Sequence, residues 1–247
     1  MQHYALIGKP LKHSFSKQYF EDMFERLGID AQYSNYEIDT IDSLPELIKE
    51  HDLCGLNITA PFKKDVIKLL SGISKEAQEL QAVNVVNINN GQLFGYNTDI
   101  IGVRKSLTDN IKGRDKALIL GTGATSRTIA LALKEKGINY LFVSRHKQGY
   151  LHYQDLTEEL IKQHTIIINA TPVGMFPDTD SCPPIPYEYI TPSHLLFDVI
   201  YNPEQTIFLM RGKERGATTI NGLQMLHTQA QAAWEIWNKE QRTKNKD

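Results

Sequence analysis

The segment KALILGTGATSRTIALALKEKG, residues 116–137, decides the fold of the second half of the chain. Its apolar run Ala117–Leu120 predicts a buried parallel strand. Gly121 and Gly123 follow, and then come apolar residues with helical spacing. A glycine turn between strand and helix lets a pyrophosphate approach the backbone at the helix N-terminus. The segment therefore predicts the first βα unit of a dinucleotide-binding domain. An ordinary glycine-rich turn is the alternative, because Ser126 stands where Gly or Ala is usual.

The residues after the next strand indicate which dinucleotide would bind. In NAD-binding domains an acidic residue at this place holds the ribose 2′-hydroxyl. Here the strand Tyr140–Val143 is followed by Ser144, Arg145, His146 and Lys147, with no carboxylate. A hydroxyl followed by cations suits a 2′-phosphate, with Arg145 as its planar partner. A solvated charge run is the alternative, but the location favours NADP over NAD.

The overall composition excludes several classes of protein. The 247 residues include 27 Lys and Arg against 29 Asp and Glu, a net charge of −2, which argues against nucleic-acid binding. The start, MQHYALIGKP, has no basic region and only a short apolar run, so no signal peptide is expected. No stretch of the chain approaches the ~18 apolar residues of a membrane span, so none is expected. Cys54 and Cys182 lie far apart, which favours reduced thiols in a cytoplasmic protein. No His/Cys cluster has zinc-site spacing, so no metal is expected.

The first half of the chain alternates strands and helices, which predicts a mostly parallel α/β sheet. Asn89-Asn90-Gly91 predicts a hairpin, expected at the sheet edge. Gly216 is expected at the C′ position of a helix. The expected strands are 4–7, 36–38, 56–59, 140–143, 165–169 and 195–199, and the expected helical segments are 17–27, 44–49, 66–70, 99–107, 156–163, 204–215 and 222–239.

The position of the glycine turn predicts two domains. A domain of nearly equal size precedes residue 116, and the short spacing between Val143 and Thr165 predicts a trimmed cofactor domain. The last helix carries an apolar stripe that includes Trp234 and Trp237 and is expected to pack on the first domain. We therefore expect a discontinuous substrate domain, residues 1–99 plus 222–247, and a Rossmann-like cofactor domain, residues 100–221.

Two segments of the first half carry polar residues that a plain core would not need. Ser14 and Ser16 lie between a strand and a helix, where an N-cap explains one serine more easily than two. Asn57 and Thr59 end a buried strand, and Lys63 follows in an expected first helical turn. A lysine opposes the helix dipole there. The alternative for Lys63 is an ordinary surface lysine.

A third polar group flanks the expected hairpin. Asn84 lies among apolar residues, where a buried amide needs a partner or a ligand. Asn97, Thr98 and Asp99 stand where the hairpin ends and a helix begins. On spacing alone, Asp99 is more simply a helix cap than a catalytic residue.

Taken together, these motifs resemble the shikimate dehydrogenase family. The matching motifs run in the family's order from residue 8 to residue 230: G-K-P-L-x-H-S-x-S, N-I-T-A-P-F-K, A-V-N, G-Y-N-T-D, G-T-G-A-T-S, I-N-A-T-P-V-G-M, D-V-I-Y-N-P and N-G-L-Q-M-L-x-x-Q-A. The resemblance implies two α/β domains with the active site in the cleft between them. It implies reversible reduction of 3-dehydroshikimate to shikimate by NADPH, in aromatic amino acid biosynthesis, by a monomer or homodimer.

The resemblance also implies roles for individual residues. Lys63 would transfer the proton, with Asp99 as its catalytic partner. Binding of shikimate would involve Ser14, Ser16, Thr59, Lys63, Asn84, Asp99, Tyr201 and Gln229. Binding of NADP would involve Gly121, Thr122, Gly123, Ala124, Thr125, Ser144, Arg145, Thr171, Met175, Val199 and Gly222. The alternatives are a quinate/shikimate dehydrogenase that uses NAD and a cofactor-binding regulatory module without turnover.

Overall fold

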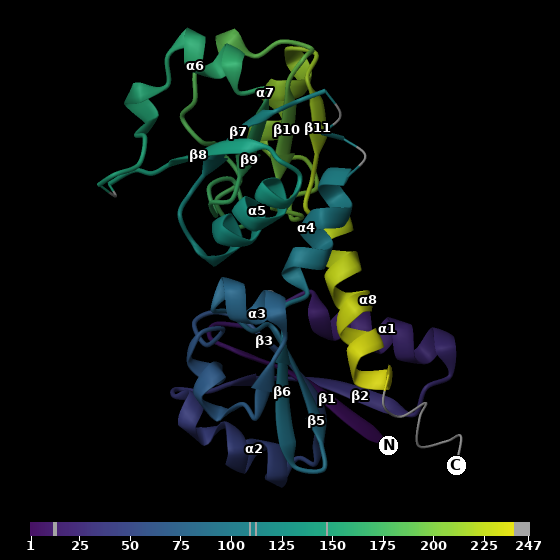
Figure 1. The fold of residues 1–247 in the computed structure, drawn as a ribbon. Helices are drawn as coiled ribbons and strands as arrows, with labels where there is room; N and C mark the ends of the chain where they lie inside the picture. Colours follow the sequence, from purple (N-terminus) through teal and green to yellow (C-terminus); the bar gives the residue numbers. More distant parts are fainter. Residues whose placement is uncertain (12–13, 109, 112, 147, 240–247) are drawn as a thin grey trace. The chain divides into compact units, whose positions relative to one another are not determined.

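The computed structural model describes residues 1–11, 14–108, 110–111, 113–146 and 148–239. The chain forms two compact units, one from residues 1–98 and the segment from residue 229 onward, the other from residues 99–228. The sequence predicted that the first segment of the first unit ends at residue 99, one residue later than in the structure. It predicted that the second segment begins at residue 222, seven residues earlier than in the structure. Figure 1 labels most of the helices and strands of both units.

The first unit is built on a six-stranded sheet with the order β2-β1-β3-β5-β6-β4. β1, β2 and β3 are parallel, whereas β5 is antiparallel to both β3 and β6. The carboxyl ends of β1, β3 and β6 therefore share one edge with the start of β5. The elements are β1 (Gln2–Gly8), α1 (Ser16–Leu27), β2 (Ala31–Glu37), α2 (Leu44–Glu50), β3 (Leu53–Ile58), β4 (Gly72–Ile73), α3 (Lys75–Leu80), β5 (Val85–Asn89) and β6 (Gln92–Tyr96), with 3₁₀ turns at Ile41–Ser43 and Asp65–Leu69.

Alternating side chains of β1 divide the core of this unit between the two faces of the sheet. Ala5 and Ile7 join a cluster with residues of α2 and α3, whereas Tyr4 and Leu6 join a cluster with residues of α1 and α8 (Leu223–Lys239). All four side chains are buried. A strand covered on both faces must be apolar at every position, which explains why YALI lacks the alternation of a half-exposed strand.

The hairpin predicted at Asn89-Asn90-Gly91 is confirmed, but its expected place at the sheet edge is wrong. β5 and β6 pair in antiparallel register around Asn90 and Gly91, whose φ angles are +49° and +76°. Two positive φ angles are typical of the tight hairpin turn that Asn-Gly favours. The edge is instead β4, a two-residue strand parallel to β6. A strand that short has too few residues for a recognisable sequence pattern.

The second unit contains a five-stranded, fully parallel sheet with the order β11-β10-β9-β7-β8. Helix α5 packs on β7 and β8, and α7 on β10 and β11. The elements are α4 (Asp99–Thr108), β7 (Lys116–Leu120), α5 (Ala124–Glu135), β8 (Asn139–Val143), α6 (Glu158–Gln163), β9 (Ile166–Asn169), β10 (Leu195–Asp198), α7 (Ile207–Glu214) and β11 (Thr218–Ile220), with 3₁₀ turns at Tyr153–Asp155 and Tyr187–Tyr189.

Helix ends follow from local capping residues. α7 begins at Ile207 rather than at the expected Glu204, because the Thr206 side chain accepts a hydrogen bond from Leu209 N and caps the helix. Gly216 follows the helix with a φ of +77°, which confirms its predicted C′ position. The expected helix over 66–70 is a 3₁₀ turn, Asp65–Leu69.

Helix α8 begins within the second unit and continues into the first. In the first unit Trp237 is buried, and its indole Nε1 donates to Val86 O at 3.0 Å. A Cβ on Gly55 would lie 2.6 Å from the Trp237 ring, so the glycine permits this close approach. The C-terminal apolar stripe thus completes the core of the N-terminal unit.

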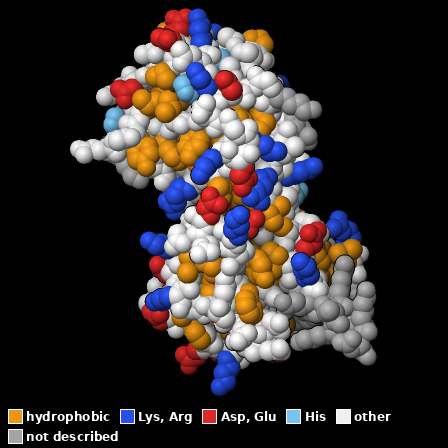
Figure 2. Space-filling view, in the orientation of Figure 1, with side chains coloured by type: hydrophobic (Ala, Val, Ile, Leu, Met, Phe, Trp, Pro, Cys, Tyr) orange, Lys and Arg blue, Asp and Glu red, His pale blue; other side chains and the backbone are white. Residues whose placement is uncertain are grey.

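Two further structural features bear on the class of protein, namely the length and apolarity of the helices and the distribution of charge on the surface. None of the helices in the described ranges combines the length and the apolar run that crossing a bilayer requires. On the face seen in Figure 2, basic and acidic side chains are interspersed. This pattern differs from the continuous basic surface expected of a nucleic-acid-binding protein.

Candidate functional site

In the first unit, the predicted substrate residues lie next to the ends of strands along one edge of the sheet. Ser14 and Ser16 come after β1, Thr59 and Lys63 after β3, and Asn84 immediately before β5. The junction of β1 and β3 is tight, because Thr59 N donates to Ile7 O at 2.9 Å and a Cβ on Gly8 would lie 2.3 Å from Thr59 Cγ2. Ligands of parallel α/β sheets bind at this carboxyl edge.

Asn84 has a buried protein partner, Thr98. Its Oδ1 accepts from Thr98 N at 2.7 Å, and its Nδ2 donates to Thr98 Oγ1 at 3.1 Å. Both residues are buried. The amide therefore fixes the backbone one residue before Asp99, which is itself buried and is the first residue of α4.

Lys63 is tied to the same region through its backbone. Its carbonyl accepts from Val83 N at 2.8 Å, one residue before Asn84. The residue is half-buried and lies in a turn before the 3₁₀ segment Asp65–Leu69. The expectation of a first helical turn was therefore wrong, because Lys63 precedes the 3₁₀ segment.

Ser14 and Ser16 do not cap α1. Phe15 occupies the N-cap position without a side-chain cap, and Ser14 Oγ accepts from Ser16 N at 3.3 Å. The Ser16 side chain lies near the phenol of Tyr33. Burial raises the pKa of Tyr33 well above its usual value, and the contact with Ser16 offsets only part of this effect. The phenol is thus neutral throughout the physiological range.

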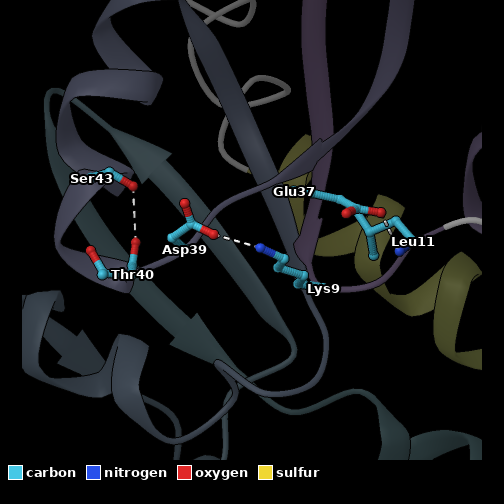
Figure 3. Close-up of polar contacts among 6 residues, drawn as sticks. All are labelled: Lys9, Leu11, Glu37, Asp39, Thr40 and Ser43. Atoms are coloured by element: carbon cyan, nitrogen blue, oxygen red, sulfur yellow. Dashed lines mark hydrogen bonds and ion pairs between the residues drawn. The ribbon is translucent and has the colours of Figure 1, made fainter.

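The loop that carries these serines is fastened to the end of β2 (Figure 3). Glu37 Oε1 accepts from Leu11 N at 2.7 Å. The Lys9 ammonium forms an ion pair with Asp39, which raises the pKa of Lys9 and lowers that of Asp39. Because the ion pair is exposed, it contributes little stability. The hydrogen bond from Leu11 to Glu37 holds the loop more directly.

In the second unit, the predicted cofactor residues also follow strand ends. The chain runs from β7 to its neighbour β8 and then returns to β9 on the other side of β7. The gap between β7 and β9 is the switch point where dinucleotides bind in such sheets. The predicted residues are Gly121, Thr122, Gly123, Ala124 and Thr125 after β7, Ser144 and Arg145 after β8, Thr171 and Met175 after β9, Val199 after β10, and Gly222 after β11.

The glycines at this edge fit a bound dinucleotide. Gly121 has a φ of +105°, and a Cβ there would lie 3.0 Å from Ala170 O. Nothing within 4 Å would meet a Cβ on Gly123, which is the N-cap of α5 and has no side-chain cap hydrogen bond. The turn thus leaves open space above a helix N-terminus, as a pyrophosphate requires. At Gly222, a Cβ would lie 2.0 Å from Val199 O.

Thr171 is held by a buried polar network. Asn169 Oδ1 accepts from Thr171 Oγ1 at 2.6 Å, and Asn169 Nδ2 donates to Asp198 Oδ1 at 3.1 Å. Asp198 also accepts from Ile200 N at 3.1 Å and from Thr206 Oγ1 at 2.7 Å. Burial raises the pKa of Asp198 to about 6, although these three donors favour its charged form. The carboxylate joins the loops after β9 and β10.

The loop after β8 carries Arg145 on the surface. Ser144 N donates to Leu151 O at 2.8 Å, and His152 Nδ1 donates to Ser144 O at 3.0 Å. Burial raises the pKa of Tyr153, and the charge of Arg145 offsets part of this effect. Lys147, the other cation named from the sequence, lies outside the described residues. Arg145 is therefore an exposed cation on a loop tied at both ends.

The remaining predicted residues lie on three segments. Tyr201 is half-buried in the loop after β10, and Gln229 is half-buried on α8. Met175 is 44% exposed in the loop after β9. Among the described residues, no group of three or more His, Cys, Asp or Glu side chains could hold a metal ion.

Comparisons with known proteins relate this arrangement to one family. Residues 6–86 match the model described as "Shikimate dehydrogenase substrate binding domain". The NADP(+) shikimate dehydrogenase of Methanococcus vannielii is 36% identical, over 94% of this chain and 90% of that protein. The chain belongs to the shikimate dehydrogenase family.

Two solved members of the shikimate dehydrogenase family resemble the chain over nearly its whole length. Shikimate 5-dehydrogenase of Thermus thermophilus, in complex with NADP(H) and shikimate, has a TM-score of 0.84 at 31% identity and covers 97% of this chain and 94% of its own. The Listeria monocytogenes enzyme, in complex with shikimate and NAD, has a TM-score of 0.80 at 26% identity, with 97% and 92% covered. Family membership therefore leaves the choice between NADP and NAD to the residues of each member.

Sequence reasoning missed two residues of the network in the first unit. Tyr33 is the one fully buried residue of the mostly polar strand β2 and resembles an ordinary core aromatic, while Asn57 was noted as ending a strand but was given no role. Tyr33 Oη donates to Asn57 Oδ1 at 2.6 Å. The alternation of polar and apolar residues cannot reveal where a buried hydroxyl points, so only the fold could identify this pair.

Proposed function

We propose that this chain is an NADP-dependent shikimate dehydrogenase that reversibly reduces 3-dehydroshikimate to shikimate in aromatic amino acid biosynthesis. The observation that carries the proposal is the cluster of polar side chains at the carboxyl edge of the first sheet. It comprises hydroxyls and amides, with Lys63 in the turn after β3. Such groups suit a small ligand with several hydroxyls. The membership of the chain in the shikimate dehydrogenase family supports the choice of ligand.

In this proposal the substrate is held by side chains from several segments. Hydroxyl and amide groups bind the hydroxyls and the carboxylate of shikimate, and Tyr201 lines the same pocket. The pairing of Asn84 with Thr98 supports this role, because an amide that the protein already holds in one orientation loses little further freedom when a ligand binds. The binding residues are Ser14, Ser16, Thr59, Lys63, Asn84, Asp99 and Gln229.

The proton chemistry is assigned to Lys63 with Asp99. When bound, NADPH supplies a hydride to the carbonyl carbon of 3-dehydroshikimate. Lys63 then gives a proton to the oxygen, so that the carbonyl becomes a hydroxyl and the added hydride and proton balance. In the oxidative direction, neutral Lys63 removes the hydroxyl proton. Asp99 orients the lysine and the substrate hydroxyl.

The choice of NADP rests on the loop after β8. Arg145 provides a planar cation for the 2′-phosphate, and Ser144 a hydroxyl beside it. No carboxylate stands at Ser144–Lys147 to bind the 2′-hydroxyl of NAD. The glycines at positions 121 and 123 and the first turn of α5 bind the pyrophosphate in this proposal. The groove is completed by Thr122, Ala124, Thr125, Thr171, Met175, Val199 and Gly222.

The proposal includes the domain division and setting expected from the sequence. The substrate domain comprises residues 1–99 plus 222–247, and the NADP domain residues 100–221. Cys54 and Cys182 are free thiols, which is consistent with the cytoplasmic location that we propose. The oligomeric state, monomer or homodimer, is a further prediction that size-exclusion chromatography with light scattering can test.

Steady-state oxidation of shikimate and quinate by the purified protein, each with NADP and with NAD, tests the proposal. We expect rapid reduction of NADP by shikimate and at least tenfold lower kcat/KM for the other three combinations, a free-energy difference of about 1.4 kcal/mol. Efficient oxidation of quinate with NAD would favour a quinate/shikimate dehydrogenase. No reduction of either cofactor would favour a regulatory module and contradict the proposal.

A further inference from the structure

Tyr33 carries a polar group into the apolar core of the first unit. The side chain lies in β2, is 1% exposed, and stacks on Phe20 with ring centroids 4.7 Å apart. A phenylalanine would fill the same space without burying a hydroxyl. Because an unpaired buried hydroxyl is costly, the partners of Tyr33 indicate what this group does.

The Tyr33 hydroxyl connects two separate parts of the polar edge. It donates to Asn57 Oδ1 at 2.6 Å, near the end of β3. Asn57 Nδ2 in turn lies 3.5 Å from Asn84 O, to which it donates. The hydroxyl and the Asn57 amide thus join β2 to the end of β3 and to the start of β5.

We propose that Tyr33 is a positioning residue for substrate recognition: its buried hydroxyl holds the side chain of Asn57, and through it the backbone at Asn84, in the orientation that binds substrate. This inference rests on the proposed function, because it acts through Asn57 on Asn84 in the substrate site. A positioning role has a specific kinetic consequence. It changes the binding of shikimate, while the binding of the cofactor and the chemical step depend on other residues.

Tyr4 provides a matched control for the loss of a buried hydroxyl. Its ring is also fully buried and belongs to the same apolar cluster as that of Tyr33. Its hydroxyl donates to Gln2 Oε1 at 3.2 Å, at the amino end of β1. Tyr4→Phe therefore removes a hydroxyl from the same core, but one that is bonded at the amino end of β1 and not near the carboxyl end of β3, where Asn57 lies.

Steady-state kinetics of Tyr33→Phe and Tyr4→Phe test the inference. We expect Tyr33→Phe to raise the KM for shikimate about three- to tenfold, as the loss of one or two hydrogen bonds implies, with kcat and the KM for NADP within about twofold of wild type. Tyr4→Phe should leave all three constants unchanged. An unchanged KM for shikimate in Tyr33→Phe, or an equal rise in Tyr4→Phe, would overturn the positioning role.

A second measurement separates positioning from loss of stability. If Tyr33 acts through Asn57, Tyr33→Phe should raise the KM much less in an Asn57→Ala background than in wild type. Full additivity of the two substitutions would overturn the inference, even if Tyr33→Phe lowers stability. Failure of the unaltered chain to oxidise shikimate would overturn the proposed function and this inference with it. Turnover with an unchanged KM in Tyr33→Phe would overturn this inference alone.

Discussion

The two sheets present different chemistry at their carboxyl edges. At the edge of the first sheet, side chains are paired with one another, as Asn84 is with Thr98 and Tyr33 with Asn57. At the edge of the second sheet, the glycine turn after β7 has open space above Gly123 and a positive φ at Gly121. One edge therefore offers fixed polar side chains and the other offers accessible backbone.

This difference corresponds to the two kinds of ligand in the proposed reaction. A small polyhydroxylated acid is distinguished by the number and direction of its hydroxyls, which calls for several oriented side chains. A pyrophosphate is recognised by backbone N–H groups at a helix N-terminus, which calls for glycine and for the absence of a side chain. The comparison therefore predicts that substitutions at the two edges affect different ligands.

The largest expected effect is at the substrate edge. Lys63→Ala should lower kcat by about 10²- to 10⁴-fold, the usual contribution of a positioned acid or base, with a modest change in the KM for shikimate. The adjacent, exposed Lys64 is the matched control, and Lys64→Ala should leave kcat unchanged. Near-normal turnover by Lys63→Ala in a steady-state assay would contradict the role of Lys63.

The next effect concerns the pH dependence of the free energy of unfolding. It distinguishes the polar network around Asp198 in the second unit from the one around Tyr33 in the first. The pKa of Asp198 is raised to about 6, whereas an unfolded aspartate titrates near about 3.9. Between these values the folded state binds more protons than the unfolded state. The free energy of unfolding therefore falls through this range as pH rises, and the stabilisation is complete only at lower pH.

Asp198→Asn removes this titration. The free energy of unfolding of Asp198→Asn minus that of wild type should rise between about pH 4 and pH 7. The rise should be up to roughly 3 kcal/mol, which corresponds to a shift of two pKa units. Urea unfolding of both proteins at several pH values measures the difference. Tyr33→Phe in the first unit is the comparison, because its neutral network should give a difference from wild type that does not vary with pH. A constant difference for Asp198→Asn would argue against the raised pKa.

Much of the fold could be predicted from local patterns, whereas the paired networks could not. Apolar runs of three or four residues predicted β1, β7 and β9, and the Asn-Gly turn predicted the hairpin. β4 has only two residues and β11 only three, so neither produces a detectable period. Ser14, Lys63 and Asn84 could be singled out from the sequence because they are polar residues near expected strand ends. The hydrogen bonds of Tyr33 and Asp198 could not be predicted, because they join chain segments that only folding brings together.

Two neighbouring glycines test the backbone side of the comparison. Gly121→Ala forces a side chain into a positive φ and against Ala170 O, so it should lower stability by roughly 1 to 3 kcal/mol and weaken NADP binding. Gly123→Ala meets no protein atom within 4 Å. It should leave stability unchanged and raise the KM for NADP about tenfold, since its methyl group enters the space proposed for the pyrophosphate. Equal losses of stability in the two variants would contradict this distinction.

The smallest effect is expected at the exposed cation. Arg145→Gln should lower kcat/KM for NADP about three- to tenfold, because an exposed pair with phosphate is weakened by solvent. The kcat/KM for NAD should not change, since NAD lacks the 2′-phosphate. The ratio of the two constants, measured in one buffer, is therefore the informative quantity. An equal loss with both cofactors would indicate a structural role for Arg145.

The dissociation constants of NADPH and shikimate, measured by calorimetry for wild type, Gly123→Ala and Tyr33→Phe, test the division of labour most directly. Each ligand is titrated in the absence of the other. We predict that Gly123→Ala weakens NADPH alone, and that Tyr33→Phe weakens shikimate alone. A variant that weakens both ligands equally would contradict the assignment of substrate to the side chains of one sheet edge and cofactor to the backbone of the other.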